Sequence, residues 1–143
     1  MRAARSPEQL DVVVTSTASD SHTWNLVYLQ LTIEEAGHRV HNLGACVPDD
    51  EVVDECLRRR PDLLVVSSVN GHGFTDGLRL ITALRSCDDL RGLPVVIGGK
   101  LGICGTAGVH GELLEAGYDA LFEDDPELAR FRGFLDSLVL VRR

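Results

Sequence analysis

Short β-type runs alternate with helical segments along most of this 143-residue chain. Each run has the length of a strand, and each is followed by a segment with helical spacing of its apolar residues. The expected strands cover residues 11–17, 38–44, 62–68, 93–99 and 118–123, and the expected helices cover residues 23–37, 49–60, 75–86, 110–117 and 126–141. Five β-then-α units in succession predict a parallel sheet with helices on both faces.

The connections between such strands restrict the topology further. Crossovers between parallel strands are right-handed, and the flavodoxin-like, doubly wound order 2-1-3-4-5 suits five strands best. We therefore expect residues 1–143 to form one α/β domain of this Rossmann-like type. In this fold, ligands bind at the carboxyl ends of the strands, near the point between the first and third strands where the order reverses.

The first expected helix is marked by an apolar stripe. Trp24, Val27, Tyr28, Leu31 and Ala36 come close to the spacing of three and four residues that places side chains on one helix face.

The charge of the chain limits its partners. The sequence has 14 Lys and Arg residues against 22 Asp and Glu residues, a formal net charge of −8. This balance argues against binding to nucleic acid or to an anionic membrane. The N-terminal segment lacks the apolar stretch of a secretory signal, and no apolar run approaches the ~20 residues of a membrane span. Four cysteines without a C-x-x-C pair favour reduced thiols in a cytoplasmic protein.

Polar and glycine residues gather where three of the expected strands end. They occupy residues 15–25 after the first strand, residues 67–73 around the end of the third, and residues 98–100 at the end of the fourth. Because the carboxyl ends of parallel strands meet at one edge of the sheet, we expect a ligand site there.

Asp20 and His22 admit two interpretations. Asp20 is a common type of helix-capping residue, and His22 is then an exposed loop residue. Alternatively, His22 is a metal ligand whose second ring nitrogen is held by the Asp20 carboxylate. One histidine holds a bare metal ion poorly, but it serves as an axial ligand to a metal already bound in a macrocycle.

The serines and glycines of this edge are equally open to two interpretations. Ser67 and Ser68 satisfy backbone groups at a strand end, or they contact a ligand. Gly98 and Gly99 form a plain turn, or they let a flat ligand approach the backbone closely.

The chain lacks residues that two nucleotide-binding motifs and a receiver domain require. No G-x-G-x-x-G follows the first strand, and Lys100, the only lysine, is not followed by Ser or Thr as a phosphate-binding P-loop requires. A phosphoacceptor receiver domain requires an acidic residue where the third strand ends in serines. The Ser- and Thr-rich loop of residues 15–21 imitates a flavodoxin phosphate loop, although Asp20 would repel a phosphate. An FMN-binding, flavodoxin-like electron carrier therefore remains an alternative function.

Taken together, the motifs at this edge resemble those of vitamin B12-binding domains. The family pattern is D-x-H-x-x-G, then S-x-L, then G-G, and the chain has Asp20-x-His22-x-x-Asn25, Ser67-x-Val69 and Gly98-Gly99. Two positions depart from it, Asn25 in place of glycine and Val69 in place of leucine.

The chain also resembles the small subunits of glutamate mutase (methylaspartate mutase). Asn42-x-Gly44 matches the N-x-G step expected after the second strand. Residues 67–76 match S-S-x-x-G-x-G-x-x-D, which ends at Asp76. The likeness extends from about residue 11 to residue 122.

This resemblance implies a role for each matching residue. His22 would displace the cofactor's own dimethylbenzimidazole and bind cobalt, and Asp20 would hydrogen-bond the other ring nitrogen. Ser67 would contact the displaced nucleotide tail. The remaining expected cofactor contacts are Ser21, Thr23, Asn25, Ser68, Val69, Gly71, Gly98, Gly99 and Lys100.

The resemblance also implies a function and a partner. We expect the cobalamin-binding small subunit of an adenosylcobalamin-dependent, glutamate mutase-like carbon-skeleton isomerase, inactive alone. A large catalytic subunit would hold the amino-acid substrate and complete a heterotetramer. A non-catalytic B12 carrier or sensor remains an alternative function.

Overall fold

Five parallel strands form the centre of the protein. In the computed structural model, which describes residues 8–100, 107–123 and 125–142, they run in the order β2-β1-β3-β4-β5. This confirms the predicted order. The strands are β1 (Asp11–Ser16), β2 (Arg39–Asn42), β3 (Leu63–Ser68), β4 (Val95–Gly99) and β5 (Ala120–Phe122).

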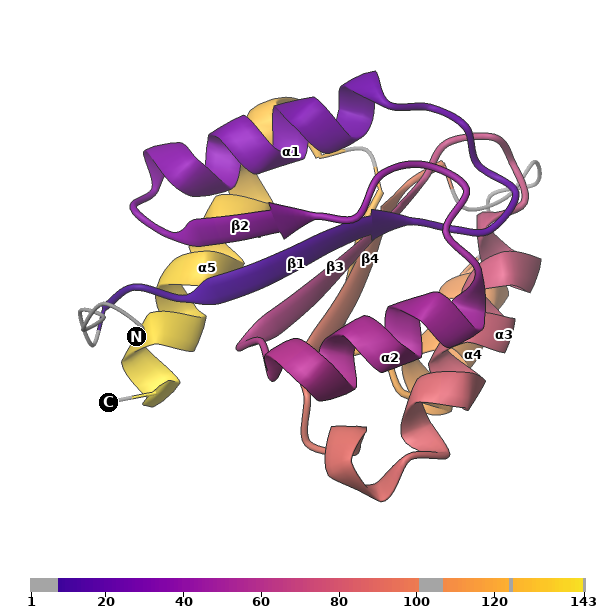
Figure 1. The fold of residues 1–143 in the computed structure, drawn as a ribbon. Coiled ribbons are helices and arrows are strands. Elements are labelled where there is room, and N and C mark those ends of the chain that lie inside the picture. The colour runs from indigo at the N-terminus through magenta and orange to yellow at the C-terminus, as the bar shows by residue number, and fades with distance from the viewer. Residues whose placement is uncertain (1–7, 101–106, 124, 143) are drawn as a thin grey trace.

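The helices lie in two layers, one on each face of the sheet (Figure 1). They are α1 (Trp24–Glu35), α2 (Asp49–Arg59), α3 (Gly73–Arg85), α4 (Ala107–Ala116) and α5 (Ala129–Arg142), with 3₁₀ turns at Asp88–Leu90 and Pro126–Leu128. Side chains of α2, α3 and α4 pack with Val13, Leu64 and Ile97 in one core. Side chains of α1 and α5 pack with Val12, Val14 and Val65 in the other. The two cores exist because successive strand residues point to opposite faces of the sheet.

Two helices begin earlier than the sequence suggests. Helix α3 starts at Gly73 rather than residue 75, because the Asp76 N–H reaches back to the His72 carbonyl at 3.0 Å. Helix α4 starts at Ala107 rather than residue 110. Residues 101–106 of the glycine-rich stretch before it lie outside the described residues.

Helix α1 packs on the sheet through a face other than the stripe that marks it in the sequence. Leu26, Thr32 and Ile33 are its buried residues, whereas Trp24, Val27, Tyr28 and Leu31 are exposed. The helix is apolar on two opposite faces, and periodicity alone does not say which of two apolar faces meets the sheet. Within the described ranges, no helix has both the length and the apolar character of a membrane span.

A pair of alanine substitutions tests this orientation of α1. Ile33→Ala should lower the free energy of unfolding by about 2–5 kcal/mol, because it opens a cavity in a packed core. Leu31→Ala should change it by about 0.5 kcal/mol or less, because Leu31 is exposed. Urea denaturation measures both, and equal losses would contradict the orientation.

Candidate functional site

A buried carboxylate joins the ends of β1 and β3. Asp20 is only 1% exposed and lies in the loop between β1 and α1. One of its oxygens, Oδ1, accepts hydrogen bonds from the His22 backbone N–H at 2.9 Å and from His22 Nδ1 at 2.8 Å. The other, Oδ2, accepts one from the Val69 N–H at 2.6 Å, directly after β3. The structure thus brings Asp20, His22 and Val69 together at the carboxyl edge of the sheet.

These hydrogen bonds fix the charge of Asp20 and the tautomer of His22. Burial by itself would raise the pKa of Asp20. The His22 and Val69 backbone N–H groups and the His22 imidazole outweigh burial, so the pKa of Asp20 is lowered. An ionised carboxylate only accepts hydrogen bonds, and His22 Nδ1 must therefore carry the ring proton. The lone pair of Nε2 is then the one able to bind a metal, on a side chain that is 56% exposed.

A second group of polar side chains forms hydrogen bonds with the same loop. Ser19 Oγ donates to the carboxylate of Asp76, a buried residue in the first turn of α3. Asn70 Nδ2 donates to the Ser19 carbonyl at 3.1 Å and lies 3.0 Å from Ser19 Oγ. Arg79 bridges Asp76 and Asp49, at 3.3 and 2.6 Å. The sequence motif of residues 67–76 includes Asp76, but the sequence predicted no role for it. Ser19 was not predicted as a contact because its partner, Asp76, is 57 residues away.

A cavity of about 150 Å³ lies next to this loop, between the sheet and the layer of α1 and α5. Five of the expected cofactor contacts line it, namely Asn25, Ser67, Val69, Gly98 and Gly99. Its remaining wall is apolar and was not predicted, and consists of Tyr28, Leu29, Val65, Val66, Val96, Phe122, Leu128 and Phe131. The alternation of strand residues offered a signal, since Val65 and Ser67 share one face of the sheet, as do Val96 and Gly98.

Both glycines of β4 are required by the protein itself. A Cβ at Gly98 would lie 2.8 Å from the Phe122 carbonyl oxygen, and one at Gly99 would lie 2.2 Å from the Ser68 carbonyl oxygen. Gly99 also has a φ of +108°, which side-chain-bearing residues rarely adopt. At both positions the absence of a side chain keeps backbone exposed at the cavity wall. Three residues before Asp20, the buried Thr17 hydroxyl has no hydrogen-bond partner among the described residues.

The other expected contacts lie around the cavity rather than in its wall. Ser21 and Thr23 are exposed in the His22 loop. Ser68 is buried, and its Oγ lies 3.4 Å from Asn70 Oδ1. Gly71 makes a turn with a φ of +88°. Lys100 is exposed, and its backbone N–H donates to the Ser68 carbonyl at 2.8 Å.

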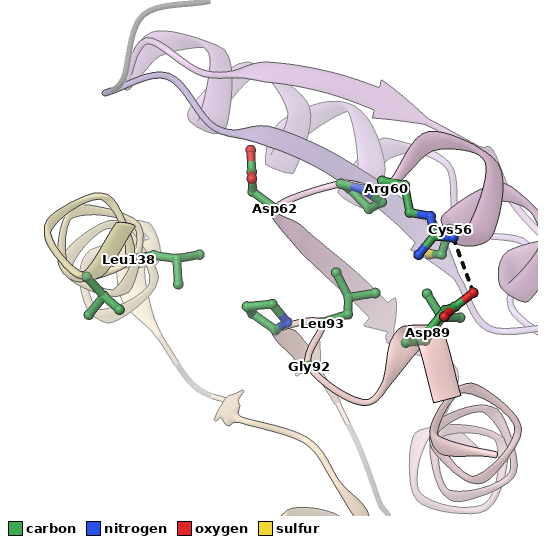
Figure 2. Close-up of a pocket in the computed structure, with 11 residues that line it drawn as sticks. Cys56, Arg60, Asp62, Asp89, Gly92, Leu93 and Leu138 are labelled. Carbon is green, nitrogen blue, oxygen red and sulfur yellow. Dashed lines mark hydrogen bonds and ion pairs between the residues drawn. The ribbon is translucent and has the colours of Figure 1, made fainter. Parts of the chain in front are cut away.

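A larger pocket, of about 380 Å³, lies at the opposite end of the sheet (Figure 2). Asp62 and Pro94, which precede β3 and β4, line it together with Leu138 of α5. Arg60 and Asp89 form an ion pair at 3.2 Å across one side of it. This pocket is at the amino ends of the strands, where doubly wound sheets do not place their ligands.

Comparison with known proteins shows to which family this chain belongs. Residues 10–119 match the family model described as B12 binding domain. The glutamate mutase sigma subunit of Escherichia coli O157:H7 is 31% identical over 121 residues, covering 82% of this chain and 79% of that protein. The sigma subunit of Halobacterium salinarum is 32% identical, with 78% and 74% covered. This chain is a B12-binding domain of the glutamate mutase sigma-subunit family.

Similar solved structures show the same fold in B12-binding and other proteins. A cobalamin-binding protein from Desulfitobacterium hafniense has a TM-score of 0.64 and 24% identity, covering 94% of this chain and 58% of that one. A response-regulator receiver domain from Francisella has a TM-score of 0.72 and 18% identity, covering 94% of this chain and all of that one. The fold alone therefore does not separate B12-binding domains from receivers, whereas the family match does.

Asp20→Asn should change the tautomer of His22. An Asn side chain presents an N–H group where the carboxylate had only acceptors, so one of the three N–H donors loses its partner. We expect a loss of about 1–3 kcal/mol in the free energy of unfolding and a shift of the imidazole toward the Nε2–H form. Nitrogen chemical shifts of ¹⁵N-labelled histidine report the tautomer. An unchanged Nδ1–H form in the variant would contradict the role of Asp20.

The stability that Asp20 provides should disappear in acid. Because folding lowers its pKa below the ordinary value of 3.8, the contribution is fully present above that value and is lost as the pH falls through the lower folded-state pKa. The difference in unfolding free energy between the wild type and Asp20→Asn should therefore shrink in titrations from about pH 6 to about pH 3. A difference that grows over this range would contradict the assignment.

Proposed function

We propose that this chain is the cobalamin-binding small subunit of an adenosylcobalamin-dependent, glutamate mutase-like isomerase, folded as a single cobalamin-binding domain. The observation that carries the proposal is the His22 imidazole, whose Nδ1 is bound by a buried carboxylate and whose Nε2 is left for a ligand. Membership of the B12-binding family supports cobalt as the metal. The names of the relatives support the mutase.

The residues present fit a cobalamin at this edge. His22 would hold cobalt through Nε2, and Asp20 would keep the proton on Nδ1, which raises the basicity of the ligating nitrogen. One histidine suffices because a corrin ring already supplies the equatorial ligands. No group of three or more candidate metal ligands occurs among the described residues, and this mode of binding requires none.

The cavity beside His22 fits the displaced nucleotide tail. Its wall of Tyr28, Phe122 and Phe131 suits a flat aromatic base, and the Ser67 hydroxyl adds a polar contact. Gly98 and Gly99 would leave backbone in contact with the tail. Ser21, Thr23, Asn25, Ser68, Val69, Gly71 and Lys100 would complete the loops around the corrin and the tail.

Catalysis by this chain needs a partner. When bound, adenosylcobalamin supplies a radical by homolysis of its cobalt–carbon bond, and the tasks of this chain are to position the cofactor and to shield one side of it from water. A large catalytic subunit would hold the amino-acid substrate, in a heterotetramer, and the isolated chain would show no turnover. We also propose a cytoplasmic location, which the free thiols of Cys46, Cys56 and Cys87 support.

Electron paramagnetic resonance of bound Co(II) cobalamin tests the role of His22. With ordinary protein, one axial nitrogen should split each cobalt line into a triplet, and protein labelled with ¹⁵N-histidine should give a doublet instead. A triplet in the labelled sample would mean that the cofactor's own base still holds the cobalt, which would contradict the proposal.

Histidine variants provide the matched control for this experiment. His22→Ala should remove the axial splitting from the protein, whereas His72→Ala, at an exposed histidine of the same edge, should retain it. Retention of FMN without any cobalamin binding would instead favour the flavodoxin-like alternative. Cobalamin binding without activity after addition of a large subunit would favour the carrier or sensor.

A further inference from the structure

Helix α1 presents an apolar surface to solvent. Trp24 is 82% exposed, Leu31 55%, Tyr28 49% and Val27 37%. These four side chains are spaced at three, four and seven residues, and we call them the α1 stripe. They are four of the seven large apolar side chains exposed among the described residues. A contiguous exposed patch of this kind marks a site of interaction more often than a scatter of single residues does.

The composition of α1 is that of an interface core. No charged residue occurs from Trp24 to Ile33, although a quarter of the chain is charged. Charged residues are depleted in the cores of protein interfaces, and Trp and Tyr are enriched among the residues that dominate binding. The opposite face of the same helix already packs on the sheet through Leu26 and Ile33. The helix is thus suited to lie between two protein layers, of which this chain supplies one.

The position of the stripe indicates which protein supplies the other layer. Trp24 opens α1 two residues after His22. Tyr28 belongs both to the stripe and to the wall of the cavity beside His22. The surface is therefore continuous with the cofactor site, and a protein that closes over His22 also meets the α1 stripe.

The stripe is too small to form a stable interface by itself. The four side chains lie along eight residues of helix, with about 10 Å along the helix axis between the first and the last. A stable interface buries about 800 Å² on each partner, much more than one such row provides. The occupant must cover adjoining surface as well, and the surface that adjoins the N-terminal end of the stripe is the loop that carries His22.

We propose that the α1 stripe is a docking surface for the large catalytic subunit, which covers both the stripe and the carboxyl edge of the sheet with His22. This inference rests on the proposed function for the identity of the partner. It adds that a protein contact outside the cofactor site, made by Trp24, Val27 and Leu31, holds the two subunits together.

The single tryptophan of the chain gives a direct readout. Protein that carries 5-fluorotryptophan in place of Trp24 should give one fluorine NMR resonance. Addition of an unlabelled, purified glutamate mutase large subunit, with cobalamin present, should shift and broaden this resonance. A resonance that stays unchanged while the two proteins co-sediment would overturn the proposal.

Charge substitutions separate docking from cofactor binding. Val27→Glu and Leu31→Glu should weaken binding to the large subunit at least about tenfold and leave cobalamin affinity within about twofold of the wild type. Leu114→Glu on α4 and Leu140→Glu on α5 change leucines of similar exposure and should bind both as the wild type does. Circular dichroism melting of all four variants checks that they fold.

The remaining outcomes are distinguishable from one another. Normal binding of the large subunit by both stripe variants would overturn the docking surface and leave the proposed function standing. Failure of the wild type to bind cobalamin would overturn the proposed function and, with it, the identity of this partner. Self-association of the wild type alone in sedimentation, abolished by Leu31→Glu, would assign the stripe to a second copy and overturn the proposal.

Discussion

The hydrogen bonds of the Asp20 carboxylate hold the candidate site together. Its two oxygens accept from three N–H groups, on His22 and on Val69, and so join two segments that are 49 residues apart in the chain. A buried carboxylate is unfavourable unless it is paired or hydrogen-bonded, and here its hydrogen bonds more than offset the effect of burial on its pKa. The same charge dictates which nitrogen of His22 is protonated. One interaction therefore fixes the loop, the tautomer and the orientation of the candidate metal ligand.

The parallel sheet makes this arrangement possible. The carboxyl ends of β1 and β3 are adjacent because the strand order reverses between them, with Ser16 paired in register with Ser67. Next to them, Ser67 pairs with Gly98 and Ser68 with Gly99. Because the two glycines have no side chain, β4 can lie close to the backbone of Phe122 and Ser68, and the β4 backbone stays exposed at the cavity. The fold thus requires glycine at the same two positions where the proposed ligand would contact the backbone.

Helix α1 shows why an amphipathic pattern is an incomplete guide. Its most regular apolar stripe faces solvent, and a second set, Leu26, Thr32 and Ile33, is buried. A helix that meets only one partner has one apolar face. The two apolar faces of α1 identify a helix that has a second surface to cover, and only the structure shows which face the sheet has already taken.

The sequence by itself determined the class of fold and predicted the location of the candidate site. Alternating strand and helix patterns together with right-handed crossovers predicted the strand order, and polar residues at three strand ends predicted the edge. The tertiary structure decided which residues that are far apart in the sequence come into contact. The contact of Asp20 with Val69, the contact of Ser19 with Asp76, and the apolar wall that joins Tyr28 to Phe131 each link separate elements. Local patterns record the period of a helix or strand, whereas these contacts depend on how the elements pack, which no local period encodes.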